Sequence, residues 1–197
     1  MSKQKKLDSV GKEAFVKAVL SMLDEGVSLR ELNLRTVARR VGCAHTNAYN
    51  YFTSFEDLLW WSLKGALEYM TGMVDPEHGD LVRWYVDFAL DHPAWYRLIW
   101  LEQLSGTPPA GVAAYLPVPA DMYTRWLMIR FGRSEKAAAL ELKGRILHGY
   151  LHGELAAITA GRVTGGREEL TERVLTGAKE LMRLLFNNSD MKGVETI

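Results

Sequence analysis

Apolar residues recur at helical spacing most clearly within residues 33–59. Positions i, i+3, i+4 and i+7 of one stripe are filled by Leu34, Val37, Ala38 and Val41. This spacing is typical of a short amphipathic helix. The next residue, Gly42, can adopt the left-handed conformation that ends a helix in a tight turn. The sequence therefore predicts a short helix that ends at Gly42.

A second helix is predicted directly after this turn, over residues 44–51. Its apolar side repeats every four residues, at Ala44, Ala48 and Phe52. Polar side chains point mostly the other way, at Thr46, Asn47, Tyr49 and Asn50. Two short helices joined by a glycine turn, the second with a hydrogen-bonding outer face, indicate a helix-turn-helix that enters a DNA major groove.

This segment resembles the DNA-binding half of the TetR family of bacterial transcriptional repressors. The usual family pattern is a threonine-capped helix, Ile-Ala, Ala-Gly-Val-Ser, Tyr-x-x-Phe and a closing Lys-x-x-Leu. The matching positions here are Asn33, Val37-Ala38, Val41 to Ala44, Tyr49 to Phe52, and Phe55 to Leu58. The match is close but not complete: Ala44 replaces the usual small hydroxyl residue, and Phe55 stands where the family commonly has a lysine that binds a phosphate.

A preceding amphipathic helix, with apolar residues from Ala14 to Leu23, ends near Gly26. The resemblance thus covers roughly residues 10–70, as a three-helix unit that leads into a fourth helix. Similar helix packing occurs in protein-interaction modules, but four consecutive elements in the family's order favour DNA binding.

The proposed docking assigns a role to each polar side chain of the motif. We expect Thr46 and Asn50 to face base edges, since asparagine can pair with adenine through two hydrogen bonds. The full set of candidate DNA contacts is Asn33, Arg35, His45, Thr46, Asn47, Tyr49, Asn50 and Tyr51. Further basic groups for phosphates are Lys12, Arg39 and Arg40. The N-terminal Lys3, Lys5 and Lys6 form either a solvated terminus or an arm that follows the phosphate backbone.

The rest of the chain shows helical periodicity and no alternating strand pattern. Helices are predicted over residues 55–72, 80–91, 93–104, 123–131, 134–160 and 167–186, with a loop over residues 105–119. The predicted fold class is all-α with about nine helices: an N-terminal three-helix helix-turn-helix domain (residues 1–54) and a C-terminal helical ligand-binding and dimerisation domain (residues 55–197). Two stretches, FALDHPAWYRLIW and LHGYLH, resemble a regulatory-domain subtype among TetR relatives.

Aromatic residues and methionines crowd the C-terminal part. Most are expected to be core, but a pocket between helices needs the same apolar surfaces with a few polar groups. The candidate ligand-binding residues are Trp61, Met70, Trp84, Phe88, Trp100, Tyr123, Trp126 and His148. They imply a small apolar or aromatic effector.

Two histidines, His148 and His152, lie four residues apart on a predicted helix, with Glu141 one heptad earlier. No fourth metal ligand can be named, so we interpret the histidines as pocket or interface residues and expect no metal. The neighbouring Gly149 and Gly153 suggest close approach of another helix.

Composition narrows the classes of function. The 197 residues are 48% hydrophobic, as in an ordinary soluble globular protein. The 24 basic and 24 acidic residues give a net charge of zero, so the protein as a whole is not attracted electrostatically to DNA. No bilayer-spanning run or signal peptide is seen, so a cytoplasmic location is expected. We interpret Cys43 as a small core residue rather than a redox sensor.

No catalytic motif or cofactor-binding motif is found, so neither an enzyme nor a bound cofactor is predicted.

The final helix carries an apolar stripe at Leu170, Val174, Ala178, Leu181 and Leu185, and Met182 and Leu184 widen it beyond what one neighbouring helix needs to cover. This predicts a homodimer through the last two helices. The sequence thus indicates a regulator that binds operator DNA and a small effector, most simply a repressor that its effector releases. The alternative is an all-α ligand-binding or protein-interaction module that no longer binds DNA.

Overall fold

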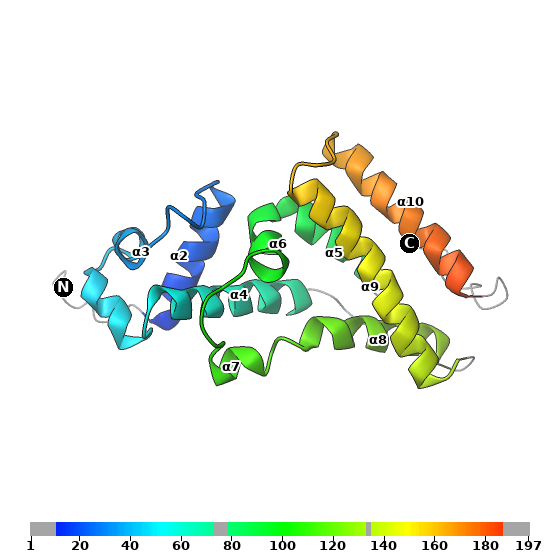
Figure 1. Cartoon of the computed structure of the whole chain (residues 1–197), viewed down its shortest axis with the longest axis horizontal. Coiled ribbons are helices and arrows are strands. Elements are labelled where there is room, and N and C mark those ends of the chain that lie inside the picture. The colour runs from blue at the N-terminus through cyan, green and yellow to red at the C-terminus, as the bar shows by residue number, and fades with distance from the viewer. Residues whose placement is uncertain (1–10, 73–78, 133–134, 187–197) are drawn as a thin grey trace. The chain divides into compact units, whose positions relative to one another are not determined.

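The structure, a computed structural model, describes residues 11–72, 79–132 and 135–186. Within these residues the secondary structure is entirely helical, which confirms the all-α prediction (Figure 1). The elements in chain order are α2 (Lys12–Asp24), α3 (Leu34–Val41), the 3-10 helix η1 (His45–Asn50), α4 (Phe55–Gly72), α5 (Leu81–Asp91), α6 (Pro93–Trp100), α7 (Ala110–Ala113), α8 (Val118–Phe131), α9 (Ala137–Thr159) and α10 (Arg167–Leu185). No helix in these three ranges is long and apolar enough to cross a bilayer.

The predicted helices are present, and the main differences lie between residues 100 and 123. Helix α6 ends at Trp100, four residues earlier than expected, and the predicted loop contains the short helix α7. Val112 anchors α7 by complete burial. Helix α8 begins at Val118, because proline within the first turn suits a helix N-terminus, where its missing N–H has no intrahelical role.

The chain divides into two compact units. Unit 1 contains Met1–Glu68 and Leu98–Leu116, and unit 2 contains Tyr69–Arg97 and Pro117–Ile197. Helices α4 and α6 each contribute residues to both units. The boundary expected from the sequence, between residues 54 and 55, remains a prediction.

The core of unit 1 forms where α2, α3 and η1 pack together. Phe15 of α2 is fully buried and meets the ring of Phe52 edge-on, with the ring centroids 5.8 Å apart. Val37 of α3 and Leu58 of α4 are also fully buried. These apolar faces hold the helix-turn-helix segment against the helices on either side of it in the sequence.

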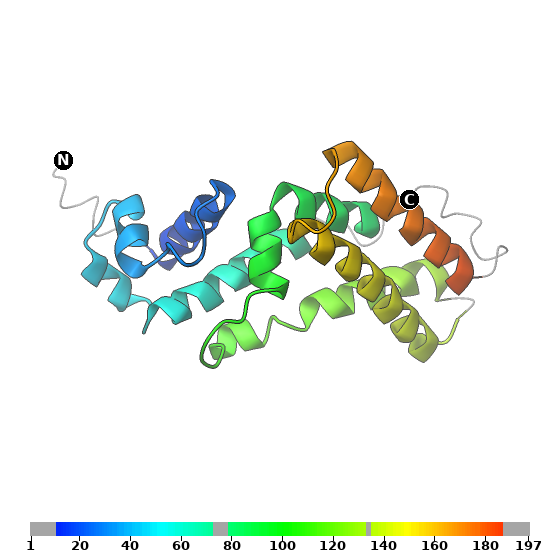
Figure 2. The ribbon, with the colours of Figure 1, turned by 45° about the horizontal axis from the view of Figure 1, so that its top comes forward.

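The core of unit 2 is built by α5, α8, α9 and α10. Figures 1 and 2 both show α9 and α10 side by side. A close contact exists at Gly177 of α10, where an added Cβ would lie 1.8 Å from the Tyr150 hydroxyl oxygen of α9. Gly177 therefore allows the two helices to approach at this point.

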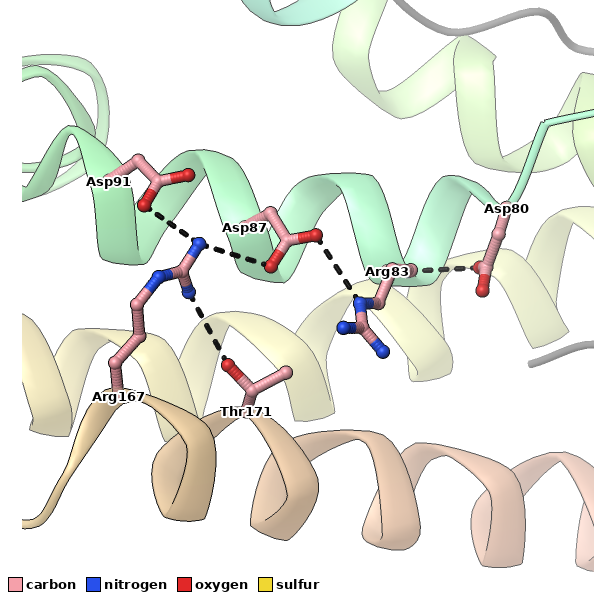
Figure 3. A network of polar contacts seen from close by, with 6 residues as sticks. All are labelled: Asp80, Arg83, Asp87, Asp91, Arg167 and Thr171. Atoms are coloured by element: carbon pink, nitrogen blue, oxygen red, sulfur yellow. Dashed lines mark hydrogen bonds and ion pairs between the residues drawn. The ribbon is translucent and has the colours of Figure 1, made fainter.

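A polar network links the start of α10 to α5 (Figure 3). The Arg167 guanidinium lies 2.7 Å from an Asp91 carboxylate oxygen and 3.3 Å from one of Asp87, and donates to the Thr171 hydroxyl over 3.4 Å. Arg83 forms a further ion pair with Asp87 at 3.3 Å. All of these residues except Asp91 line a groove of about 760 Å³. Because exposed ion pairs add little free energy, we interpret the network mainly as a positioning contact.

We expect Gly177→Ala to lower the free energy of unfolding by about 1–3 kcal/mol, because the added methyl group overpacks the contact with Tyr150. Thr176→Ala, at the exposed neighbouring position, is the matched control and should change stability by less than about 0.5 kcal/mol. Urea denaturation of both variants measures the difference, and equal stabilities would contradict the close approach.

Candidate functional site

Helix α3 is fixed at both ends by local interactions. The Asn33 side-chain oxygen accepts hydrogen bonds from the backbone N–H groups of Arg35 (3.1 Å) and Thr36 (3.0 Å). The Thr36 hydroxyl in turn accepts from the Asn33 backbone N–H at 3.1 Å. This is a capping box, which satisfies N–H groups that a helix start leaves unpaired. Asn33 therefore acts first as a helix cap.

The turn after α3 has the predicted geometry. Gly42 adopts φ +83°, in the left-handed region, and its N–H donates to the Ala38 carbonyl at 3.0 Å. A residue with a Cβ would be strained at this φ. The turn thus directs the chain into the second helix of the motif.

This second helix, η1, is a 3-10 helix instead of the predicted α-helix, and it spans His45–Asn50. The prediction that Ala44 lies on the apolar side is wrong, because Ala44 precedes the helix and is exposed. Ala48 and Phe52 are buried as predicted. In such a short element the contacts of these two side chains outweigh the poorer hydrogen-bond geometry of the 3-10 form.

The exposed side of η1 carries hydrogen-bonding side chains. Thr46 and Asn50 are exposed, Tyr49 is 58% exposed, and Asn47 is half-buried. Tyr51 is also exposed, although its ring lies 6.0 Å from that of Phe15. The polar face that the sequence predicts therefore reaches solvent.

A groove of about 780 Å³ borders this face within unit 1. Its lining residues are Asn33, Leu34, Arg35, Thr36, Arg39, His45, Tyr49, Thr53, Ser54 and Phe55. It thus brings together four of the candidate DNA contacts. The groove also contains Arg39, which the sequence suggests as a further phosphate contact, and Thr36, which was not among the predicted DNA contacts.

The basic groups near the groove differ in their partners. Arg40 forms an ion pair with Glu25. Arg35 and Arg39 are exposed and have no ion pair with any other described residue. These two cations remain available to an anion such as a DNA phosphate. Lys3, Lys5 and Lys6 lie outside the described residues.

Cys43 is half-buried beside this turn. Burial raises the pKa of its thiol, so the reactive thiolate is disfavoured.

A second candidate site is a cluster of buried tyrosines and half-buried histidines in unit 2. Its five members come from four helices: Tyr85 (α5), Tyr96 (α6), Tyr123 (α8), His148 and His152 (α9). The Tyr85 hydroxyl lies 3.3 Å from His148 Nε2, and the Tyr96 hydroxyl lies 2.7 Å from His152 Nδ1. The rings of Tyr123 and His148 are 5.1 Å apart. We call these five residues the Tyr/His cluster.

Desolvation controls the protonation of the cluster. Burial, together with the proximity of His152, lowers the pKa of His148 to about 4, and burial also lowers that of His152. Burial raises the pKa values of Tyr85, Tyr96 and Tyr123. The cluster is consequently uncharged at neutral pH.

The structure separates the candidate ligand-binding residues into groups. Tyr123 and His148 belong to the Tyr/His cluster. The rings of Trp84 and Phe88 both lie near the ring of Tyr69, with centroids 6.1 and 6.3 Å from it. The Trp84 indole N–H donates to the Met70 carbonyl at 2.6 Å.

The three remaining tryptophans lie elsewhere. Trp126 is buried and donates to the Gly79 carbonyl at 3.2 Å. Trp61 and Trp100 belong to unit 1. Trp61 lines a pocket of about 540 Å³ there, with the Lys12 ammonium over its ring.

Sequence reasoning missed Tyr85 and Tyr96 as partners of the histidines. Each is 0% exposed, and nothing in its local pattern separates it from a core aromatic residue. Within residues 11–72, 79–132 and 135–186, no three His, Cys, Asp or Glu residues gather into a possible metal site. An added Cβ at Gly149 or Gly153 would meet nothing within 4 Å, so the close helix approach expected there is not found among the described residues.

Comparison with known proteins identifies the fold. No protein-family model matches the sequence, and no curated protein matches it. Among solved structures, the chain is similar to a TetR variant from Acinetobacter baumannii AYE, solved in complex with minocycline. The TM-score is 0.63 at 16% sequence identity, and the match covers 96% of this chain and 100% of the other. The chain therefore has the fold of a TetR regulator, in agreement with the sequence pattern.

The depressed histidine pKa makes stability depend on pH. Between the unfolded pKa, about 6.5, and the folded value of about 4, the unfolded chain binds a proton that folded His148 does not. We therefore expect the free energy of unfolding to fall as the pH drops from 7 to 5, with His148 contributing at most about 1.4 kcal/mol per pH unit.

Urea denaturation at pH 7, 6 and 5 measures this slope. His148→Gln retains a polar side chain that does not titrate in this range, so its slope should be shallower. An unchanged slope in the variant would contradict the assignment to His148.

Proposed function

We propose that this chain is a member of the TetR family and acts as a ligand-responsive, DNA-binding transcription regulator. The observation that carries the proposal is the groove beside η1. It combines the exposed cations Arg35 and Arg39 with Tyr49 and lies next to the exposed Thr46 and Asn50. Cations for phosphates beside side chains for base edges are what duplex recognition requires. A regulator of this kind works in the cytoplasm.

The proposed mechanism is release from the operator by an effector bound in unit 2. Helix α4 contributes Leu58 to unit 1 and Met70 to unit 2, so one continuous helix contains residues of both. An effector that stabilises one position of α4 thereby stabilises one distance between the two η1 helices of a dimer. Successive major grooves accept only a spacing near one turn, about 34–36 Å. Coupling of this kind is typically about 1–3 kcal/mol.

A second candidate function is an all-α ligand-binding or protein-interaction module that has lost DNA binding. Phe55 supports it, because this apolar side chain lines the groove where relatives commonly have a phosphate-binding lysine. The zero net charge also supplies no general attraction to DNA.

DNA binding can be tested by gel shift with the region upstream of the protein's own gene. Asn50→Ala should change sequence preference, because a bidentate contact to a base contributes about 1–3 kcal/mol of discrimination. Arg39→Ala should weaken binding to all sequences alike and reduce the salt slope by about one.

Arg40→Ala is the matched control, since Arg40 is already paired with Glu25 and should affect binding less than Arg39→Ala. A wild-type protein that fails to bind the upstream DNA would support the module without DNA binding. If the wild type binds and both Asn50→Ala and Arg39→Ala bind in the same way, the proposed docking is wrong.

We further propose a homodimer through α9 and α10. Leu170, Val174 and Ala178 of the predicted stripe are buried within the chain itself. Leu184 of α10, which widens the predicted stripe, is 70% exposed, and Leu142 (50%) and Ile146 (40%) of α9 add exposed apolar surface. Gly149 and Gly153 continue the same face of α9 with open space above them. A second copy would cover this surface.

We expect the wild-type chain to sediment as a dimer at micromolar concentration and Leu142→Arg to shift it toward the monomer, because a buried unpaired charge is costly. The control is Leu116→Arg, at an exposed leucine of unit 1 (38% exposed), which should remain dimeric. Wild-type chains that sediment as monomers would exclude this interface.

A further inference from the structure

The hydroxyl of Tyr123 is the unexplained polar group in the core of unit 2. Tyr123 is 1% exposed, and its hydroxyl oxygen has no hydrogen-bond partner among the described residues. Its ring contacts Tyr85 edge-on at 5.8 Å and His148 at 5.1 Å. A phenylalanine would fill the same space without burying an unpaired hydroxyl, which destabilises a folded protein. The Tyr123 hydroxyl is therefore a candidate hydrogen-bond donor to a ligand.

Among the residues that the structure describes, those around this hydroxyl are polar and uncharged at neutral pH. The facing titratable groups are Tyr85 from α5, Tyr96 from α6, and His148 and His152 from α9. The groups that shift the pKa values of Tyr85, Tyr123 and His148 electrostatically are all within this cluster. A charged ligand would lose its hydration here and gain no counter-charge.

We propose that the Tyr/His cluster recognises an uncharged aromatic compound that carries a hydrogen-bond acceptor, such as an aryl ketone, and that the Tyr123 hydroxyl donates to this acceptor. The inference rests on the proposed function, since it names the chemical class of the effector. Edge-on and stacked contacts with Tyr85, Tyr123 and His148 suit a flat aromatic ring. A hydrocarbon would leave the Tyr123 hydroxyl unpaired, and a carboxylate would bring an uncompensated charge.

The test uses the full-length protein and three probes of matched shape: acetophenone (uncharged, with an acceptor), ethylbenzene (no acceptor) and benzoate (anionic), together with their naphthalene analogues. Isothermal titration calorimetry measures each dissociation constant. The ketones should bind most tightly. Tyr123→Phe should weaken ketone binding about tenfold, to the level of the hydrocarbons, since that is the usual loss for one hydrogen bond.

Thermal melting of the free variants gives a second, independent readout. Tyr123→Phe should melt at or above the wild-type temperature, because it removes an unpaired hydroxyl. Tyr96→Phe is the matched control and should melt lower, because it loses the 2.7 Å hydrogen bond to His152.

Several outcomes would overturn the proposal: no binding by either ketone, tighter binding of either acid, or ketone binding that Tyr123→Phe leaves unchanged. Lower melting of Tyr123→Phe would also overturn it, because the hydroxyl would then have a partner, such as a water molecule, in the free protein. The gel shift without any probe tests the proposed function separately, so failure of the ligand class leaves DNA binding untouched.

Discussion

The cost of burying polar groups is the constraint on which the core of unit 2 depends. Helix α9 buries Leu147, Leu151 and Leu155, and the same helix carries His148 and His152 partly into the interior. Each imidazole stays uncharged and lies near a tyrosine hydroxyl from another helix, Tyr85 or Tyr96. These contacts hold α5 and α6 to α9 at specific positions, which apolar packing alone does less selectively.

The same constraint connects stability to ligand choice. A core that keeps its histidines neutral and its tyrosines protonated contains hydrogen-bonding groups without charge. Tyr123 is the member whose hydroxyl has no partner in the described chain. Proteins often retain locally unfavourable features where function requires them, at some loss of stability. An unpaired hydroxyl in an otherwise paired cluster is a feature of this kind.

In unit 1 the geometry of the helix-turn-helix is determined mainly by interactions between residues close together in the sequence. The capping box of Asn33 and Thr36 fixes the start of α3, and the left-handed Gly42 fixes its end. Buried Ala48 and Phe52 then hold η1 so that Thr46, Tyr49 and Asn50 face solvent. The exposed polar face is therefore the consequence of a few short-range interactions and two apolar anchors. Arg35 and Arg39 line the groove beside this face because both lie on α3, the helix that the capping box starts.

The sequence by itself determined the all-α class, most helix boundaries, the glycine turn and the polar face of the motif. These depend on hydrogen bonds and side-chain periodicity over three to eight residues, which can be read directly from the chain. Only the tertiary structure decided that η1 is a 3-10 helix, that Leu170 and Val174 are covered within the chain, and that Trp61 and Tyr123 belong to different units. It also decided which tyrosines meet the histidines, since Tyr85 and His148 are brought together by the packing of helices far apart in sequence. Local periodicity marks such residues as buried, but it contains no information about the partner that each one meets.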